Sequence, residues 1–157
     1  MYLAALLVLV GAVIALLVWL VRASGQVHVR NEVVAGVEHA LSLIASEIRE
    51  AQGLYTPYEY ASPPASPWSQ LSLETRKNAP TGETSTYVDF FLCGTRICVK
   101  REFAAPEALT PETIEIQSLQ FTQVKTNAIS SVHIVVEAQY GDAFHRAQTT
   151  VSLRAYE

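Results

Sequence analysis

Hydrophobic and polar residues follow two different patterns along the first 52 positions, and each pattern predicts one half of a single helix. Residues 1–21 carry no charge, and thirteen of them are Leu, Ile or Val. A helix needs about 20 apolar residues to cross the hydrocarbon of a bilayer. Residues 1–22 are therefore predicted to form a transmembrane helix half. No proline interrupts the chain before Gln52, so the helix is expected to continue without a break.

The second helix half, residues 23–54, is predicted to be amphipathic. Its apolar residues recur every three or four positions, a spacing that places them in one stripe along a helix. Gly53, followed by Pro57, supplies a stop. We predict that the stripe packs against a β-sheet, and its residues are Val34, Val37, Leu41, Ile44, Ile48 and Ala51.

Residues 55–69 are predicted to form a loop. They contain four of the seven prolines, which forbid helix and break strand ladders. The segment also contains Tyr55, Tyr58, Tyr60 and Trp68. These aromatic side chains have two interpretations: they are interface anchors, or they fold back on the helix, which we favour.

A β-hairpin is predicted around Gly94 and Thr95. Apolar residues alternate with polar ones on both sides of this turn, which is the pattern of paired strands with one buried face. If the loop has two residues, Leu92 lies opposite Ile97, Phe90 opposite Val99, and Asp89 opposite Lys100. A shorter strand at Leu71 and Leu73 precedes the hairpin.

The remaining strands contain one change of parity. Ile114 and Ile116 alternate in one phase, whereas Leu119 and Phe121 alternate in the other. Because side chains in a strand have a period of two, the change predicts a bulge near Gln117 and Ser118. Two further strands follow, with apolar faces formed by Val132, Ile134, Val136, Ala138 and Tyr140, and by Ala147, Thr149, Val151 and Leu153.

These elements predict an α+β fold. An antiparallel sheet with one apolar face, residues 70–157, and a helix with an apolar stripe satisfy each other's need for burial. We therefore expect the long N-terminal helix to lie across one antiparallel sheet, while its first half extends beyond the domain. Exposed apolar surface of that size must be covered by lipid or by identical helices.

Gly11 and Ala15 form a pair of small residues within the uncharged segment. Such pairs allow helices to approach closely, in lipid or in a filament core. The pair is short and alanine is common, so specific packing and chance are both open interpretations.

Composition excludes several classes of function. The chain has 157 residues and a net charge of −4, with a pI of about 5.6. This balance argues against a nucleic-acid-binding module, which requires clustered Lys and Arg. No nucleophile elbow, phosphate-binding loop or dinucleotide-binding motif is present, and the four histidines lack the spacing of a metal site. We therefore predict no enzymatic activity, no metal and no cofactor.

Cys93 and Cys98 flank the predicted hairpin turn. In the two-residue register they lie on one face but diagonally, and direct pairing of the two cysteines would require a longer loop. The pair is compatible with a disulfide in an oxidising compartment or with free thiols. A zinc site would need a second pair of Cys or His ligands.

The order of elements resembles that of type IV pilin-like proteins, in particular minor pilins and the J-type pseudopilins of type II secretion. Local strings are similar to recurring segments of that group, and the resemblance spans nearly the whole chain. The strings are Ile44-Ala-Ser-Glu-Ile-Arg-Glu-Ala51, Gln70-Leu-Ser-Leu-Glu74, Tyr87-Val-Asp-Phe90, Leu109-Thr-Pro111, Leu119-Gln-Phe121 and Val151-Ser-Leu-Arg154.

The sequence departs from the family at its start. The family's basic leader ends in Gly and is cut by a prepilin peptidase, and the mature chain then begins with Phe-Thr-Leu-Ile-Glu or a similar string. Neither is present here, so we carry over no processing residue. Arg22 and Arg30 follow the apolar segment and no basic residue precedes it, which by the positive-inside rule would leave the domain in the cytoplasm. A leader upstream of Met1 would account for both departures.

The resemblance implies a structural subunit of a type IV pilus or a type II secretion pseudopilus. Such a subunit would sit in the inner membrane with its domain extracytoplasmic, and would assemble through its N-terminal helix. Its partners would be other pilin or pseudopilin subunits, the assembly platform and, if a leader exists upstream, a prepilin peptidase. Two alternatives are open: a single-pass anchored module that binds an extracytoplasmic ligand, and a cytoplasmic domain oriented by Arg22 and Arg30.

Overall fold

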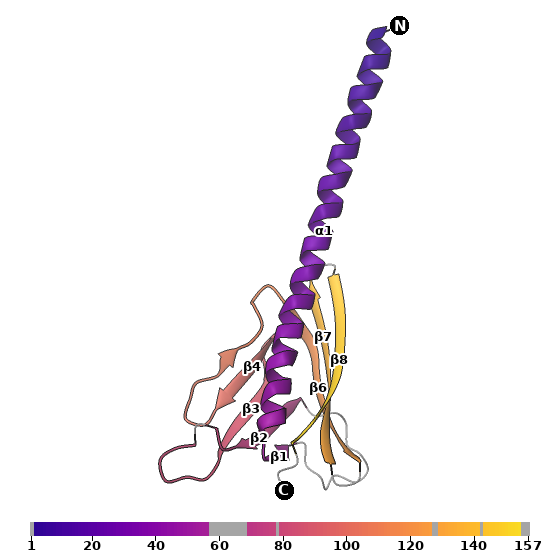
Figure 1. The fold of residues 1–157 in the computed structure, drawn as a ribbon. Helices are drawn as coiled ribbons and strands as arrows, with labels where there is room; N and C mark the ends of the chain where they lie inside the picture. The colour runs from indigo at the N-terminus through magenta and orange to yellow at the C-terminus, as the bar shows by residue number, and fades with distance from the viewer. Residues whose placement is uncertain (1, 57–68, 78, 127–128, 142, 155–157) are drawn as a thin grey trace.

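One long helix and eight strands make up the chain in a computed structural model, which describes residues 2–56, 69–77, 79–126, 129–141 and 143–154. Helix α1 spans Tyr2–Glu50, and its 49 residues correspond to a length of about 74 Å. Figure 1 shows that the N-terminal half of α1 extends far beyond the strands, which all gather around its C-terminal half.

The first sheet has five antiparallel strands in chain order. Its central hairpin turns at Gly94 (φ 67°), with a two-residue loop as predicted. The predicted register is confirmed: Leu92 pairs with Ile97, Phe90 with Val99, and Asp89 with Lys100. The strands are β1 (Gly53–Thr56), β2 (Gln70–Thr75), β3 (Thr86–Cys93), β4 (Arg96–Arg101) and β5 (Glu107–Ala108).

The second sheet has three longer antiparallel strands, β6 (Glu115–Thr126), β7 (Ile129–Tyr140) and β8 (Ala143–Ser152). The register of β6 against β7 shifts between Ile116 and Ser118, which confirms the predicted bulge. The shift returns Leu119 and Phe121 to the buried face, where both are at most 3% exposed.

The predicted fold class is wrong, because the strands do not form one sheet under a helix. The chain is mostly β, with eight strands divided between two separate antiparallel sheets. Residues from α1 and from both sheets share one core, and α1 contacts β2 of the first sheet as well as β7 and β8 of the second. In Figure 1 the strands β2–β4 and β6–β8 lie on opposite sides of the C-terminal half of α1.

The segment between β5 and β6 explains why one sheet becomes two. Strand β5 has only two residues, and the chain then crosses back over the hairpin turn. The amide of Leu109 donates to the carbonyl of Ile97 at 2.8 Å, and the amide of Ile116 donates to the carbonyl of Thr95 at 2.8 Å. Alternation along a strand specifies which face is buried, but it does not specify where a sheet ends.

The loop predicted for residues 55–69 is wrong at its first residues. Strand β1 includes Tyr55 and pairs with β2 through an irregular register. The ring of Tyr55 makes an edge contact with Tyr87, at 5.7 Å between centroids, rather than folding onto the helix. Residues 57–68, which include Tyr58, Tyr60 and Trp68, lie outside the described residues.

Candidate functional site

The N-terminal half of α1 presents a continuous apolar surface that nothing in the described chain covers. Ten large side chains there are between 46% and 69% exposed: Leu6, Leu9, Val10, Val13, Ile14, Leu16, Leu17, Val18, Trp19 and Leu20. Burying one such side chain is worth about 1.5 to 3 kcal/mol. Leaving ten of them half exposed therefore forgoes on the order of 10 kcal/mol, which is comparable to the whole stability of a domain.

Gly11 and Ala15 lie within this surface and are exposed. A Cβ added at Gly11 would meet no atom within 4 Å. The structure therefore gives Gly11 no packing role within the chain, and the space beside it is open to a second helix.

Among the residues whose side chains are described, no helix is both long enough and apolar enough to cross a bilayer.

The C-terminal half of α1 supplies one wall of the core. Val37, Ile44 and Ile48 are fully buried and Leu41 is 5% exposed, whereas Val34 is only partly buried. Val33 takes the core position instead, at 0% exposure. Two adjacent valines both fit a spacing of three to four, so periodicity alone does not choose between them.

Gly36 was not singled out from the sequence, yet it marks the closest approach between α1 and the segment that joins the two sheets. A Cβ at this position would lie 2.5 Å from Ile114 Cδ1 and 3.6 Å from Pro111 Cδ. A glycine inside a helix costs about 1 kcal/mol relative to alanine. A glycine within the predicted amphipathic half was a weak signal of a close contact, because Gly11 in the same helix has no neighbour within 4 Å.

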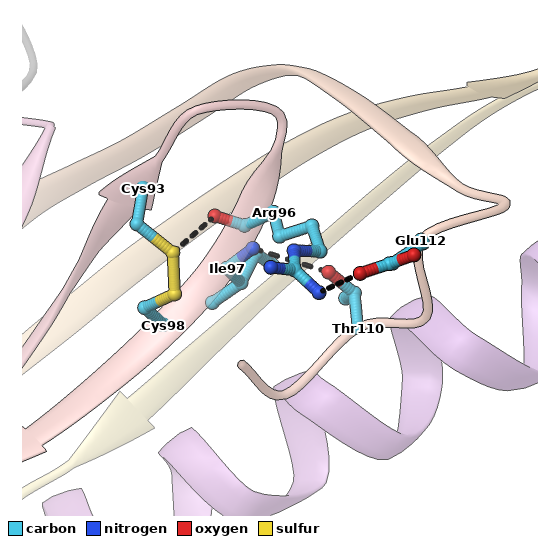
Figure 2. The surroundings of a disulfide bond; sticks show 6 residues. All are labelled: Cys93, Arg96, Ile97, Cys98, Thr110 and Glu112. Atoms are coloured by element: carbon cyan, nitrogen blue, oxygen red, sulfur yellow. Dashed lines mark hydrogen bonds and ion pairs between the residues drawn. A yellow bond between two sulfur atoms is a disulfide. The ribbon is translucent and has the colours of Figure 1, made fainter. Parts of the chain in front are cut away.

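A disulfide joins Cys93 and Cys98, with the Cα atoms 5.8 Å apart. The register pairs Cys93 with Arg96 and Cys98 with Phe91, so the bridge runs diagonally across the hairpin. Figure 2 shows how the turn is tied to the segment between the sheets. Arg96 Nη1 donates to Glu112 Oε1 at 3.1 Å, and the amide of Ile97 donates to the buried Thr110 Oγ1 at 3.1 Å.

Two ion pairs fasten the end of α1 to the first sheet. Lys77 Nζ donates to Glu50 Oε2 at 2.9 Å, and Arg101 Nη2 donates to Glu47 Oε1 at 3.0 Å. The hydrogen bond to Glu50 raises the pKa of Lys77 above its ordinary value; the charges of Glu47 and Glu50 add to this effect, and burial and Arg101 oppose it. Sequence analysis missed these pairs, since their partners are at least 27 positions apart.

The titratable residues considered in the sequence form no catalytic arrangement in the described structure. Asp89 and Lys100 face each other across the hairpin, but no ion pair joins them. His133 shares a hydrogen bond of 2.9 Å with Thr150, while His39 is exposed. Within the described ranges, no three His, Cys, Asp or Glu residues are grouped so that they could hold a metal ion.

Comparison with known proteins identifies no relative: no protein-family model, no curated protein and no solved structure matches the chain.

Proposed function

We propose that the protein is a structural subunit of a pilin-like filament, either a type IV pilus or a type II secretion pseudopilus. One observation carries the proposal: a continuous helix whose apolar half extends outside the domain, with its large described side chains about half exposed. Packing against the same half of sister helices would cover this surface along its length. Gly11, with nothing near it, would allow those helices to approach closely.

The described side chains support a structural role better than a catalytic one. The buried residues of the domain are apolar apart from Ser72, Thr75, Thr86 and Thr110. Enzymatic sites gather titratable groups in a cleft, whereas the ion pairs described above, Lys77 with Glu50, Arg101 with Glu47 and Arg96 with Glu112, lie at the surface.

We further propose that the domain faces the extracytoplasmic side, with the apolar half held in the inner membrane before assembly. The uncharged run of residues 1–21 supports the membrane location, and the disulfide between Cys93 and Cys98 supports an oxidising compartment.

Cross-linking within the exposed apolar half tests the proposal. Full-length chains would carry two added cysteines in that half, Leu6→Cys with either Val10→Cys, Val13→Cys or Leu17→Cys. Since the native cysteines are already joined, only the added thiols are free to react. After oxidation in the membranes of producing cells, a filament subunit gives ladders of covalent oligomers for at least one of these pairs.

A matched control carries the two cysteines elsewhere in the chain. The exposed positions Thr81 and Glu83, on the turn before β3, should give no ladder. An anchored ligand-binding module would give occasional dimers and nothing larger at every pair. That result would refute the filament proposal.

A further inference from the structure

Two arginines, Arg49 and Arg154, line a pocket at the C-terminal end of α1, although the chain as a whole has a net charge of −4. The pocket at this end has a volume of about 450 Å³ and is lined by Arg49, Glu50, Thr150, Val151, Ser152 and Arg154. Glu50, the one carboxylate among these residues, is engaged by Lys77. Arg49 and Arg154 make no ion pair with any described residue. We call this lining the basic pocket.

Unpaired carboxylates lie at the other end of the packed half of α1. Glu32 and Glu38 are exposed where the helix enters the domain, and neither forms an ion pair with a described residue. We call these two residues the acidic neck. One molecule therefore carries complementary charges at two places that cannot meet within the same chain, because a straight helix separates them.

The spacing of these charges matches a stagger between parallel helices. Glu38 and Arg49 are eleven positions apart, which is about three helical turns, so they lie on nearly the same side of α1 about 17 Å apart along its axis. A second parallel chain displaced by that distance brings its Glu38 level with Arg49 of the first. The same displacement brings its Leu6 level with Leu17, so the exposed apolar halves still overlap.

We propose that the basic pocket of one subunit binds the acidic neck of the next copy of this chain, and so sets the axial stagger of the filament. This inference rests on the proposed function. The contact joins two different surfaces, head to tail, and such contacts generate open-ended polymers rather than closed dimers. Paired Arg side chains suit carboxylates because the guanidinium presents several N–H donors.

Charge reversal on either side of the contact tests the pairing. The experiment uses the full-length chain with Leu6→Cys and Leu17→Cys, the cysteine spacing that matches the stagger. One variant reverses the basic pocket with Arg49→Glu and Arg154→Glu, and the other reverses the acidic neck with Glu32→Arg and Glu38→Arg. Each variant alone repels its own copies, and the ladder should weaken at least tenfold.

Mixing the two variants supplies the decisive measurement. When both are produced in the same cells and alternate in the polymer, the acidic pocket of the first variant faces the basic neck of the second, and the basic pocket of the second faces the acidic neck of the first, so every contact is complementary. Alternating ladders should then recover to at least half of the original intensity. Glu83→Arg with Glu107→Arg makes the same change in net charge as the neck variant at exposed sites elsewhere, and it should leave the ladder unchanged. Thermal midpoints equal to the parent's show that all variants are folded.

The outcomes separate the two proposals. Ladders that survive both reversals overturn the pairing of pocket and neck, while the filament proposal stands. Reversals that abolish the ladder without recovery in the mixture also overturn the pairing. If the unreversed chain forms no ladder at any of the three cysteine spacings, the filament proposal itself fails, and this inference fails with it.

Discussion

Gly36 allows α1 to approach closely the segment that joins the two sheets. Helix α1 passes so close to the segment between the sheets that a single added carbon would lie 2.5 Å from Ile114 Cδ1. Ile114 is fully buried, so its side chain would have to shift within the core to make room for the added carbon. The position thus fixes how closely the helix seats against the junction of the two sheets.

Replacing Gly36 with alanine should destabilise the domain. We expect Gly36→Ala to cost about 1 to 2 kcal/mol from overpacking, less the helix propensity that alanine gains. Because alanine gains about 1 kcal/mol in helix propensity, the net cost is about 1 kcal/mol at most, and the thermal midpoint should fall by no more than about 5 °C. Gly11→Ala is the control, because its Cβ would meet no atom, and it should not lower the midpoint.

A second substitution checks the physical reason. Ile114→Val removes the Cδ1 atom that the new methyl group would strike. In a double-mutant cycle, Gly36→Ala should cost less when it is combined with Ile114→Val than when it is made alone. Additive effects would show that the predicted contact does not exist.

The diagonal disulfide should add only modestly to stability. It closes a short loop, with a sequence separation of 5, and the loop-entropy relation gives about 2 kcal/mol at most for so few residues. Hydrogen bonds of the hairpin and the contacts to Thr110 and Glu112 remain without it. Cys93→Ser with Cys98→Ser should therefore fold, and denaturant titration should show a loss of no more than about 2 kcal/mol. Failure of this variant to fold would contradict the expectation.

At the scale of elements, the alternation of apolar and polar residues predicted the local features of the strands. The bulge after Ile116 and the pairing of Phe90 with Val99 follow from side-chain parity and a two-residue turn, and both are observed. The division into two sheets was not predictable in this way, because it depends on hydrogen bonds at Leu109 and Ile116 to the hairpin turn. Parity assigns faces, whereas these long-range contacts decide which strands are neighbours.

The same distinction applies to the candidate site. The absence of charged residues from positions 1–21 was enough to identify the half of α1 that does not pack against the domain. The basic pocket could not be predicted, since Arg49 and Arg154, which both line it, are 105 positions apart in the sequence. Only the packing of α1 against β8 creates that neighbourhood.

A charge in the buried stripe of α1 should unfold the domain rather than only block assembly. Ile44 is 0% exposed and lies among apolar residues, so Ile44→Asp buries a carboxylate without a partner. The cost is several kcal/mol, a large part of a typical domain stability of about 5 to 15 kcal/mol. Circular dichroism should show loss of the cooperative thermal transition.

Leu43→Asp is the matched control for this prediction. It introduces the same side chain one position earlier, where the native leucine is 39% exposed. This variant should keep a cooperative transition near that of the parent. An Ile44→Asp protein with the parent's midpoint would show that the stripe does not form the core.

At the scale of the whole molecule, folding and assembly use different parts of one helix. Among the side chains of α1 that the structure describes, the buried ones begin at Val33, and the exposed apolar ones, apart from Leu43, lie at or before Leu20. The domain therefore does not depend on the apolar half for its core, and the apolar half is left available for other helices.

Removing residues 1–20 should separate the two properties. We expect the shortened chain to keep the thermal midpoint of the parent within a few degrees, because the buried core side chains that the structure describes all lie at Val33 or later and remain in place. It should no longer pellet with membranes, and it should not co-sediment with polymers of the full-length chain. A shortened chain that still fractionates and polymerises like the parent would contradict the assignment of assembly to the apolar half of α1.

Because α1 continues without a break from Tyr2 to Glu50, the orientation of its N-terminal half determines the position of the domain at its other end. For a helix of this length that stays straight, a tilt of about 10° at the N-terminal end would carry the other end sideways by about 13 Å. A small change in the orientation of the first residues of α1 would thus move the domain formed by the two sheets by roughly the width of a neighbouring helix. A displacement of the N-terminal end of α1 would therefore be transmitted to the β-strands packed around its C-terminal half.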